Sequence, residues 1–457
     1  MIQCLDKCLK GKIKEAALDL YWLIAIPVLF ILILIHEVGH FVAARLMKVR
    51  IEEFGIGFPP RMLVLGERNG VKYTLNWIPI GGFVKMAGEE DPDVPGSLAS
   101  KKPWQRIFVL TAGALMNLLL AFILFTGLAL YGHTEIVSQR IGAYRVEASS
   151  PAERADIQPG DWIVSANGRP IHSQSDILIE TTLSRGVTIT MVLDRQGQPV
   201  TTTLRPRKEG EYPKDQQGPI GIRLVYYESP VTIQYLSPGS PAETAGLRVG
   251  DVITAIDGQP VTDSMDYVVY ADTHMSQTLT LSVRRDGQDL PPIQVSNTIA
   301  YESWPMGIDY LHLGYVTYSL GQALAEGVQE TVDATVLIPR TLASLVRGSV
   351  PLSDMSGIVG ITYTAAQVVR TAGLYGLLRL MAIISVNLFL VNLFPLPALD
   401  GGRIAFVLLE WIRGGRRISP EKEGLVHMIG FILLLAFVAI ITYYDIARWI
   451  SMSGGSP

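Results

Sequence analysis

The stretch "ILILIHEVGHFVAAR", residues 31–45, places two histidines and a glutamate in a run that is otherwise apolar up to Arg45. Polar and charged groups are costly inside a membrane-spanning helix, so these three side chains need a common purpose. His36 and His40 are four residues apart, and in a helix both imidazoles can therefore point at one ion. Glu37 has the spacing of a general base beside a metal-bound water. The stretch predicts a membrane-embedded metal site.

The composition of the chain indicates a membrane protein with a large polar part. Hydrophobic residues make up 49% of the 457 residues and charged residues 18%, against roughly 25% charged in soluble proteins. Runs at 20–47, 107–131, 374–399 and 425–444 are long enough to cross a bilayer, which takes about 20 helical residues. We therefore expect a polytopic α-helical fold with four transmembrane helices. The net charge of −4 gives no indication of nucleic-acid binding.

The placement of lysine and arginine predicts the orientation of the spans. The connection between the last two spans carries five such residues, whereas the chain after the last span has only Arg448. The excess predicts that this connection faces the cytoplasm. Alternation then puts residues 48–106 inside and residues 132–373 outside. The N-terminal extension, residues 1–19, falls outside despite its four lysines; its Cys4 and Cys8 are interpreted as ordinary thiols, and a redox or metal element is the alternative.

The outer segment contains an internal repeat. "SPAERADIQPGDWIVSANGRPI", 150–171, aligns with "SPAETAGLRVGDVITAIDGQPV", 240–261, with ten of 22 positions identical, and "PIGI" at 219–222 has its counterpart in "PMGI" at 305–308. We expect two α+β domains of roughly 90 residues, over 137–226 and 227–312. Residues 313–373 are predicted to be a linker that contains an amphipathic helix over 315–347.

A catalytic zinc site needs a third protein ligand and an open position. Between the first two spans stand five glutamates, none in an apolar setting: Glu52, Glu53, Glu67, Glu89 and Glu90. Asp400 instead ends the stretch "NLFLVNLFPLPALDGG", 387–402, on the same predicted side of the membrane as the histidines. Two prolines break this helix, which is tolerated in a membrane where the chain lines a cavity. Asn392 is interpreted as a group that holds a substrate backbone, or alternatively as a helix–helix hydrogen bond.

Together these features resemble a known family. HExxH in the first span, NxxPxPxLDG (392–401) in the third, and repeats between spans that resemble PDZ domains are similar to the site-2 family of intramembrane zinc metalloproteases, and most similar to its bacterial branch with two PDZ domains. The resemblance implies that His36, His40 and Asp400 bind Zn²⁺, that Glu37 is the catalytic base and that Asn392 binds substrate. The stretch "YTLNWIPIGGFVKMAGE", 73–89, resembles the family's membrane-associated β-hairpin, in which Gly81 and Gly82 would hold substrate.

The resemblance also implies partners and a location. Substrates would be single-span membrane proteins of the anti-sigma factor or signal-peptide type, trimmed outside by an upstream protease, in the bacterial inner membrane and in contact with its lipid. The PDZ-like domains would be extracytoplasmic, as a size filter or as a docking site, and the active site would lie near the cytoplasmic side. "AGALMN", 112–117, is interpreted as helix packing. Two alternatives are a metal transporter and a membrane-anchored PDZ scaffold without proteolysis.

Overall fold

The structure is a computed structural model, and it describes residues 24–89, 91–211, 218–298, 305–355 and 357–453. The predictions for residues 1–19, including Cys4 and Cys8, lie outside this range. The chain forms two compact units. We call residues 1–133, 317–339 and 351–457 the helical unit, and residues 134–316 and 340–350 the sheet unit.

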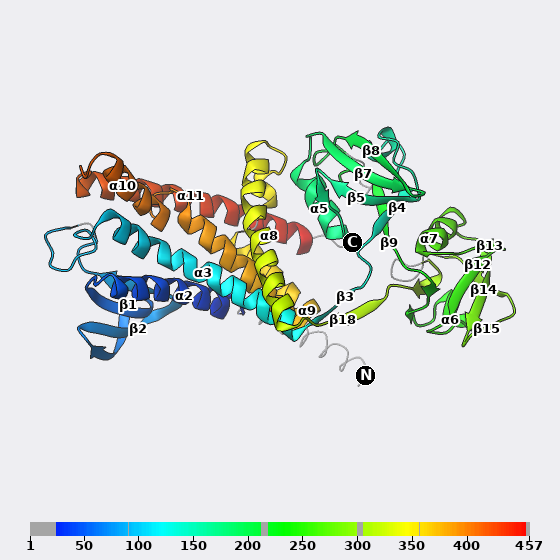
Figure 1. The fold of residues 1–457 in the computed structure, drawn as a ribbon, viewed down its shortest axis with the longest axis horizontal. Coiled ribbons are helices and arrows are strands. Elements are labelled where there is room, and N and C mark those ends of the chain that lie inside the picture. The colour runs from blue at the N-terminus through cyan, green and yellow to red at the C-terminus, as the bar shows by residue number, and fades with distance from the viewer. Residues whose placement is uncertain (1–23, 90, 212–217, 299–304, 356, 454–457) are drawn as a thin grey trace. The chain divides into compact units, whose positions relative to one another are not determined.

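Among the described residues of the helical unit, four helices are long and apolar enough to cross a membrane: α2 (Ala25–Leu46), α3 (Pro103–Tyr131), α9 (Ile358–Leu393) and α11 (Pro420–Ser453). The four expected spans are therefore present. Helix α3 packs against both α2 and α9 (Figure 1). Much of the apolar surface of α11 is exposed, including Ile432 and Leu433, as expected for a helix that faces lipid.

The third span differs from its predicted range of 374–399. Helix α9 begins at Ile358, contains a non-helical residue at Gly373 (φ 58°, ψ −145°), and ends at Leu393. The predicted start lies next to this break. The residues before Gly373 are more polar, so hydropathy alone does not predict that they belong to the span. The predicted end was too late, because Pro395 and Pro397 cannot continue a helix. After this turn comes the short helix α10 (Asp400–Ile412).

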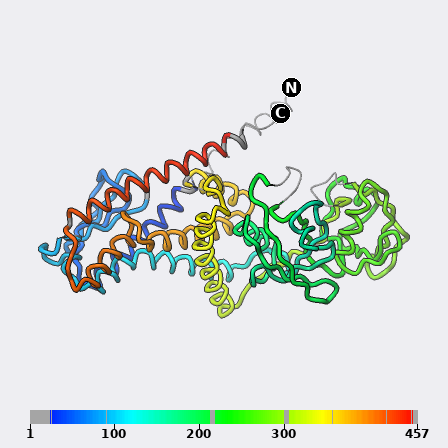
Figure 2. The backbone as a smooth tube through the Cα atoms, turned by 90° about the horizontal axis from the view of Figure 1, so that it is seen from above, coloured from blue at the N-terminus to red at the C-terminus, as the bar shows by residue number. Residues whose placement is uncertain are grey.

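A β-hairpin connects α2 to α3. Strand β1 (Ile51–Arg68) pairs with β2 (Val71–Met86), and residues 53–56 lie in register with both 72–75 and 82–85, so the two long strands fold back on themselves. The hairpin predicted from 73–89 therefore uses 51–68 as its second strand. The hairpin, α10 and the start of α11 lie at the same end of the helical unit (Figures 1 and 2).

The sheet unit contains the predicted repeat. The first sheet has the order β8-β7-β5-β4-β9 and the second the order β10-β12-β14-β15. The first copy consists of β4 (Ile141–Val146), α4 (Pro151–Arg154), β5 (Asp161–Ala166), β6 (Arg169–Pro170), α5 (Gln174–Leu183), β7 (Ile189–Arg195), β8 (Gln198–Leu204) and β9 (Ile222–Tyr226).

The second copy follows the same order along the chain, and its helix α7 lies 90 residues after α5. It consists of β10 (Val231–Thr232), β11 (Tyr235–Leu236), α6 (Pro241–Thr244), β12 (Val252–Ile256), β13 (Gln259–Pro260), α7 (Ser264–Thr273), β14 (Thr278–Arg285), β15 (Gln288–Asp289), β16 (Ile293–Ser296), the 3-10 turn η2 (Pro305–Gly307) and β17 (Ile308–Asp309). The sequence repeat is therefore also a structural repeat.

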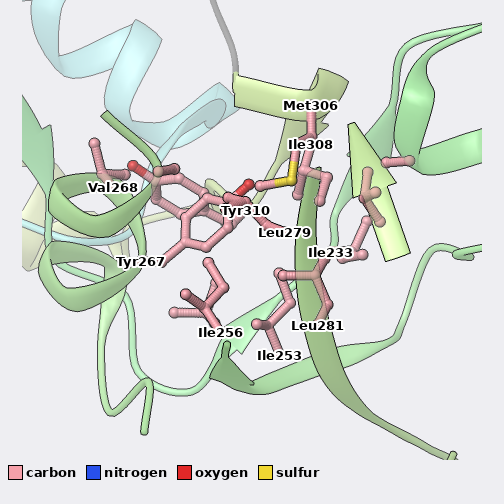
Figure 3. Close-up of a cluster of buried hydrophobic side chains, with 14 of the residues drawn as sticks. Ile233, Ile253, Ile256, Tyr267, Val268, Leu279, Leu281, Met306, Ile308 and Tyr310 are labelled. Atoms are coloured by element: carbon pink, nitrogen blue, oxygen red, sulfur yellow. The ribbon is translucent and has the colours of Figure 1, made fainter. Parts of the chain in front are cut away.

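Each copy has its own hydrophobic core. The first gathers around Ile163, Met191 and Leu193. The second gathers around the edge-to-face rings of Tyr267 and Tyr310, with Ile253 and Leu281 beneath them (Figure 3). A small α+β domain has to bury its own apolar face, so two copies of such a domain require two separate cores.

An equivalent buried ion pair stabilises each copy. Asp251, directly before β12, accepts hydrogen bonds of 2.6 and 2.8 Å from Arg285, and Asp161, the first residue of β5, accepts bonds of 2.7 and 2.8 Å from Arg195. Burial alone raises the pKa of Asp251, but the hydrogen bonds from Arg285 and from the Arg248 amide outweigh it and hold the pKa below its usual value. Asp251 therefore stabilises the fold in its charged form.

Strands β3 (His133–Ile136) and β18 (Leu313–Val316) pair where the chain enters and leaves the repeats. Helix α8 (Leu320–Val346) follows, within the range predicted as helix, and then the 3-10 turn η3 (Leu352–Asp354). The first part of α8 crosses α3 and α9 (Figures 1 and 2), with Glu330 2.7 Å from Arg379 of α9. Its last turns belong to the sheet unit, where Arg340 bonds the buried Glu180 at 2.6 and 2.8 Å.

We predict that Arg285→Met lowers the free energy of opening of β12 and β14 by about 3–5 kcal/mol, because it leaves Asp251 buried and unpaired. The matched control is Arg284→Met, since the Arg284–Asp289 pair has side chains 51% and 74% exposed and contributes at most about 1 kcal/mol. Hydrogen exchange of the β12 and β14 amides measures both. The contribution of Asp251 should be complete above about pH 4 and be lost as the pH falls through its lower folded-state pKa. Equal effects of the two variants would contradict this account.

Candidate metal centre

Two imidazoles of helix α2 (His36 and His40) direct their Nε2 atoms toward the same position. His36 and His40 are one turn apart on the buried face of the helix, with side chains 11% and 7% exposed. Their Nε2 atoms lie 3.1 Å apart and their rings meet edge to face. Two neutral imidazoles gain nothing from such an approach unless a proton or a cation lies between them. The predicted helical spacing of the motif is therefore realised.

Asp400 completes the group from the first residue of α10. Its Oδ2 lies 3.1 Å from Nε2 of His36 and 3.2 Å from Nε2 of His40. The turn before it is tight: a Cβ at Gly401 would lie 2.1 Å from the Phe394 carbonyl oxygen, and one at Gly402 would lie 2.4 Å from the Leu396 carbonyl oxygen. The two glycines that follow Asp400 therefore allow α10 to fold back onto the end of α9.

The three atoms fit a zinc ion. In a tetrahedral site with bonds of about 2.0–2.1 Å, neighbouring ligand atoms lie roughly 3.3–3.4 Å apart, close to the 3.1–3.2 Å seen here. Two imidazoles and one carboxylate leave the fourth position open, as in a catalytic site. Helix α3 leaves room beside them, because a Cβ at Gly113 would stand 2.3 Å from Nε2 of His40 and 2.8 Å from Nε2 of His36. His36, His40 and Asp400 could therefore hold Zn²⁺.

A hydrogen bond fixes the orientation of one imidazole. Nδ1 of His40 lies 2.9 Å from the carbonyl oxygen of Val109 in α3. A carbonyl only accepts, so Nδ1 carries the proton and the lone pair of Nε2 faces the site. Such outer contacts determine which nitrogen can bind a metal. Helix α3 therefore contributes a backbone carbonyl and a glycine to the centre.

Glu37 lies against the hairpin. Its Oε2 accepts a 3.0 Å hydrogen bond from the N–H of Val84 in β2. Strand β2 can come this close because of Gly81 and Gly82: a Cβ at Gly81 would lie 2.3 Å from Cγ2 of Ile33, and one at Gly82 would lie 2.7 Å from the carbonyl oxygen of Gly55. In the described structure both glycines serve close packing between the hairpin, α2 and β1.

Ion pairs hold α10 in place. Arg106 of α3 lies 2.5 Å from Glu410 of α10, both buried, and Arg417 lies 3.0 Å from the same carboxylate. Arg403 pairs with Glu89 just after β2. A buried pair of this kind is strongly destabilising when one partner is removed. These pairs therefore fix the helix that carries Asp400 to α3 and to the hairpin.

None of the four described glutamates considered as a third ligand joins the histidines. Glu52 pairs with Lys85, Glu53 with Arg61 and Glu89 with Arg403, and Glu67 lies in the exposed part of β1. Glu90 lies outside the described residues. Asn392 is half-buried in the last turn of α9, and its amide has no hydrogen-bond partner among the described residues.

Sequence reasoning missed Gly113 and the Arg106–Glu410 pair. The run "AGALMN" was interpreted as packing, yet Gly113 lies directly against both histidines. An HExxH motif needs an empty space beside it, and a glycine in an apolar helix is the signal that could have found it. The ion pair joins residues 304 positions apart, and no local pattern in the sequence predicts it.

A cavity of about 500 Å³ lies within the sheet unit, between the two copies of the repeat. Its lining includes Arg223 and Tyr226 of β9, Asp272 of α7, and Tyr310. Arg145 of β4 bonds Asp272 at 2.6 Å, which ties the two copies together. The cavity is therefore bounded by a strand of one copy and a helix of the other.

Comparison with known proteins identifies the family of this chain. A family model described as peptidase family M50 matches residues 24–437. The chain is 30% identical over 448 residues to the regulator of sigma-E protease RseP of Escherichia coli K12, covering 93% of this chain and 97% of that protein. It is 30% identical over 445 residues to a candidate zinc metalloprotease of Neisseria meningitidis serogroup A, NMA0084, covering 92% and 97%. A second regulator of sigma-E protease, from Haemophilus influenzae, is 28% identical over 445 residues, covering 92% and 96%.

The family match extends over most of the chain, residues 24–437, and includes both stretches that supply the three candidate ligands. Peptidases of this family are zinc-dependent, and the two imidazoles and one carboxylate are ligands that suit zinc. The chain belongs to peptidase family M50.

Proposed function

We propose that this protein is an intramembrane zinc protease that cleaves single-span membrane proteins. The observation that carries the proposal is the meeting of His36 and His40, with Glu37 beside them on the candidate span α2, with Asp400, which follows the turn at the end of the candidate span α9. A soluble peptidase does not need such helices around its metal. The expected substrates are of the anti-sigma factor or signal-peptide type; the name of the E. coli relative connects that protein with sigma-E.

In this proposal the chain's own residues divide the chemistry between them. A bound zinc ion would act as a Lewis acid, lowering the pKa of a water and polarising the peptide carbonyl. Glu37 takes the proton from the attacking water and delivers it to the leaving nitrogen as the C–O bond forms and the C–N bond breaks. The hydrogen bond from the Val84 N–H fixes the direction of the Glu37 carboxylate. Gly113 keeps the adjacent space free.

A helical substrate hides its carbonyl groups in hydrogen bonds and has to unwind before it can be cleaved. The hairpin offers a strand that an unwound segment could join, with Gly81 and Gly82 close to α2. The amide of Asn392 has no hydrogen-bond partner in the described parts of the chain, and this supports a role in holding the substrate backbone. We place the metal site near the cytoplasmic side of the inner membrane and the repeats outside, from the distribution of lysine and arginine.

The two repeats are proposed to be PDZ-like domains that select substrates. The cavity between them, lined by β9 and α7, could admit an extended peptide or simply form part of a bulky barrier. We favour the barrier, a size filter that rejects substrates until an upstream protease has trimmed them. A docking site is the alternative. A scaffold without chemistry does not require the convergent ligands, and a metal transporter would need polar groups along several spans.

We predict that Glu37→Gln abolishes peptide cleavage while zinc remains bound at one ion per chain. The amide is nearly isosteric and Glu37 is not one of the three convergent ligand atoms, so only the proton acceptor is lost. Metal content and cleavage of a reconstituted substrate are measured on the same sample. Retained hydrolysis in this variant would refute the assignment of the base.

We expect Asp400→Ala to lower zinc content and cleavage together, because it removes the only carboxylate of the convergent group. Losing one of three ligands should weaken zinc binding by more than about tenfold. Glu89→Ala is the matched control, since Glu89 is a nearby carboxylate bonded to Arg403 and not to the histidines. Full zinc occupancy in Asp400→Ala would mean that the third ligand lies elsewhere.

Removing residues 137–312 should separate chemistry from selection. Val137 N–H bonds the carbonyl of His312 at 3.1 Å, so a two-residue Asn-Gly turn can join Ile136 to Leu313. The helical unit retains all three candidate ligands and should bind zinc. A filter predicts that the shortened protein cleaves substrates that still carry a folded outer domain, which the full chain rejects.

The assay compares matched substrates with and without the outer domain in reconstituted membranes. Slower cleavage of both substrates would favour docking over filtering. Unchanged discrimination between the two substrates would rule out the filter.

A further inference from the structure

The turn before Asp400 contains a residue in an unfavourable conformation. Ala398 has a φ of +74°, in the left-handed region that residues other than glycine rarely adopt because Cβ crowds the backbone. It stands two residues before Asp400 and one before Leu399, the N-cap of α10. The φ angle of Ala398 sets the direction in which the chain continues to Asp400, so a change of this angle would move the Asp400 carboxylate relative to the histidines.

A histidine from the last span holds this turn. Nδ1 of His427, on α11, accepts a 2.8 Å hydrogen bond from the N–H of Ala398. The imidazole is 14% exposed, its Nε2 lies 4.0 Å from Oε1 of Glu423, and its ring packs against Phe406 of α10 at 5.4 Å. One side chain therefore contacts the strained residue and the helix that carries Asp400.

The contact depends on a close approach of α11 to the turn. A Cβ at Gly430 would lie 2.2 Å from Cβ of Pro397. Gly430 is almost one turn after His427, so both face the segment 397–398. In an apolar environment a backbone N–H without an acceptor is costly. The hydrogen bond to His427 gives the N–H of Ala398 an acceptor in the left-handed conformation that the turn adopts, and it therefore stabilises the turn in that conformation.

We propose that His427 is a positioning residue of the metal centre. It touches neither metal nor substrate; it holds the amide of Ala398, and through that turn it aims the Asp400 carboxylate at His36 and His40. The inference rests on the proposed function, in which Asp400 is a zinc ligand. Neither the HExxH motif nor the NxxPxPxLDG motif includes His427, which comes from a third, separate part of the chain.

The test measures zinc affinity of the full-length protein in detergent, by competition with a chromophoric chelator after metal removal. His427→Leu removes the acceptor and should weaken zinc binding by about tenfold or more, the usual effect of losing an outer-shell contact. His427→Asn keeps an acceptor oxygen at the place of Nδ1 and should stay close to wild type. Gly424→Ala, where an added Cβ meets nothing within 4 Å, is the control for substitution in α11.

A second variant tests the turn itself. Glycine adopts positive φ without the crowding that alanine suffers, so Ala398→Gly combined with His427→Leu should bind zinc more tightly than His427→Leu alone. A merely structural role of α11 predicts no such recovery. Wild-type affinity in His427→Leu, an equal loss in His427→Asn, or no recovery in the double variant would each overturn the proposal.

Asp400→Asn, measured in parallel, separates this inference from the one it rests on. If Asp400→Asn binds zinc like wild type, the proposed metal site is wrong. If it binds weakly while His427→Leu does not, only the positioning role of His427 is wrong.

Discussion

Three ligand atoms from two distant parts of the chain meet within 3.2 Å of one another, and most of the helical unit can be understood from what this meeting requires. Two imidazoles and a carboxylate crowded together in an apolar surrounding need a shared proton or a cation between them. The neighbouring structure leaves space for that cation and little freedom for the ligands. Gly113 provides the space, the Val109 carbonyl orients His40, and the buried Arg106–Glu410 pair holds α10.

The same constraint explains why the hairpin is folded so tightly against α2. Val84 bonds Glu37 through its backbone N–H, and the packing of Gly81 on Ile33 is what brings the strand within reach. The hairpin is tied to α10 in turn through Glu89 and Arg403. The segment proposed to receive an unwound substrate is thereby connected to both helices that carry the candidate metal ligands.

The features that the sequence could predict are those formed by residues close to one another in the chain. The four apolar helices, the i and i+4 histidines on one helix and the 90-residue repeat follow from local patterns or direct self-similarity, and the structure contains each of these features. Asp400 could be picked out because its apolar setting distinguished it from the glutamates. The start of α9 was misplaced by the break at Gly373, since hydropathy detects apolar length and not helix continuity. Gly113, Glu410 and His427 act through contacts between helices, which neither spacing nor composition encodes.

X-ray absorption at the zinc edge of the purified, zinc-loaded protein tests the central claim most directly. The account predicts only nitrogen and oxygen neighbours at about 2.0–2.1 Å, with the multiple-scattering signature of two imidazoles. A sulfur neighbour at about 2.3 Å would contradict it and point to Cys4 or Cys8. A spectrum with one imidazole or none would contradict it as well, since both His36 and His40 would then have to face a different partner.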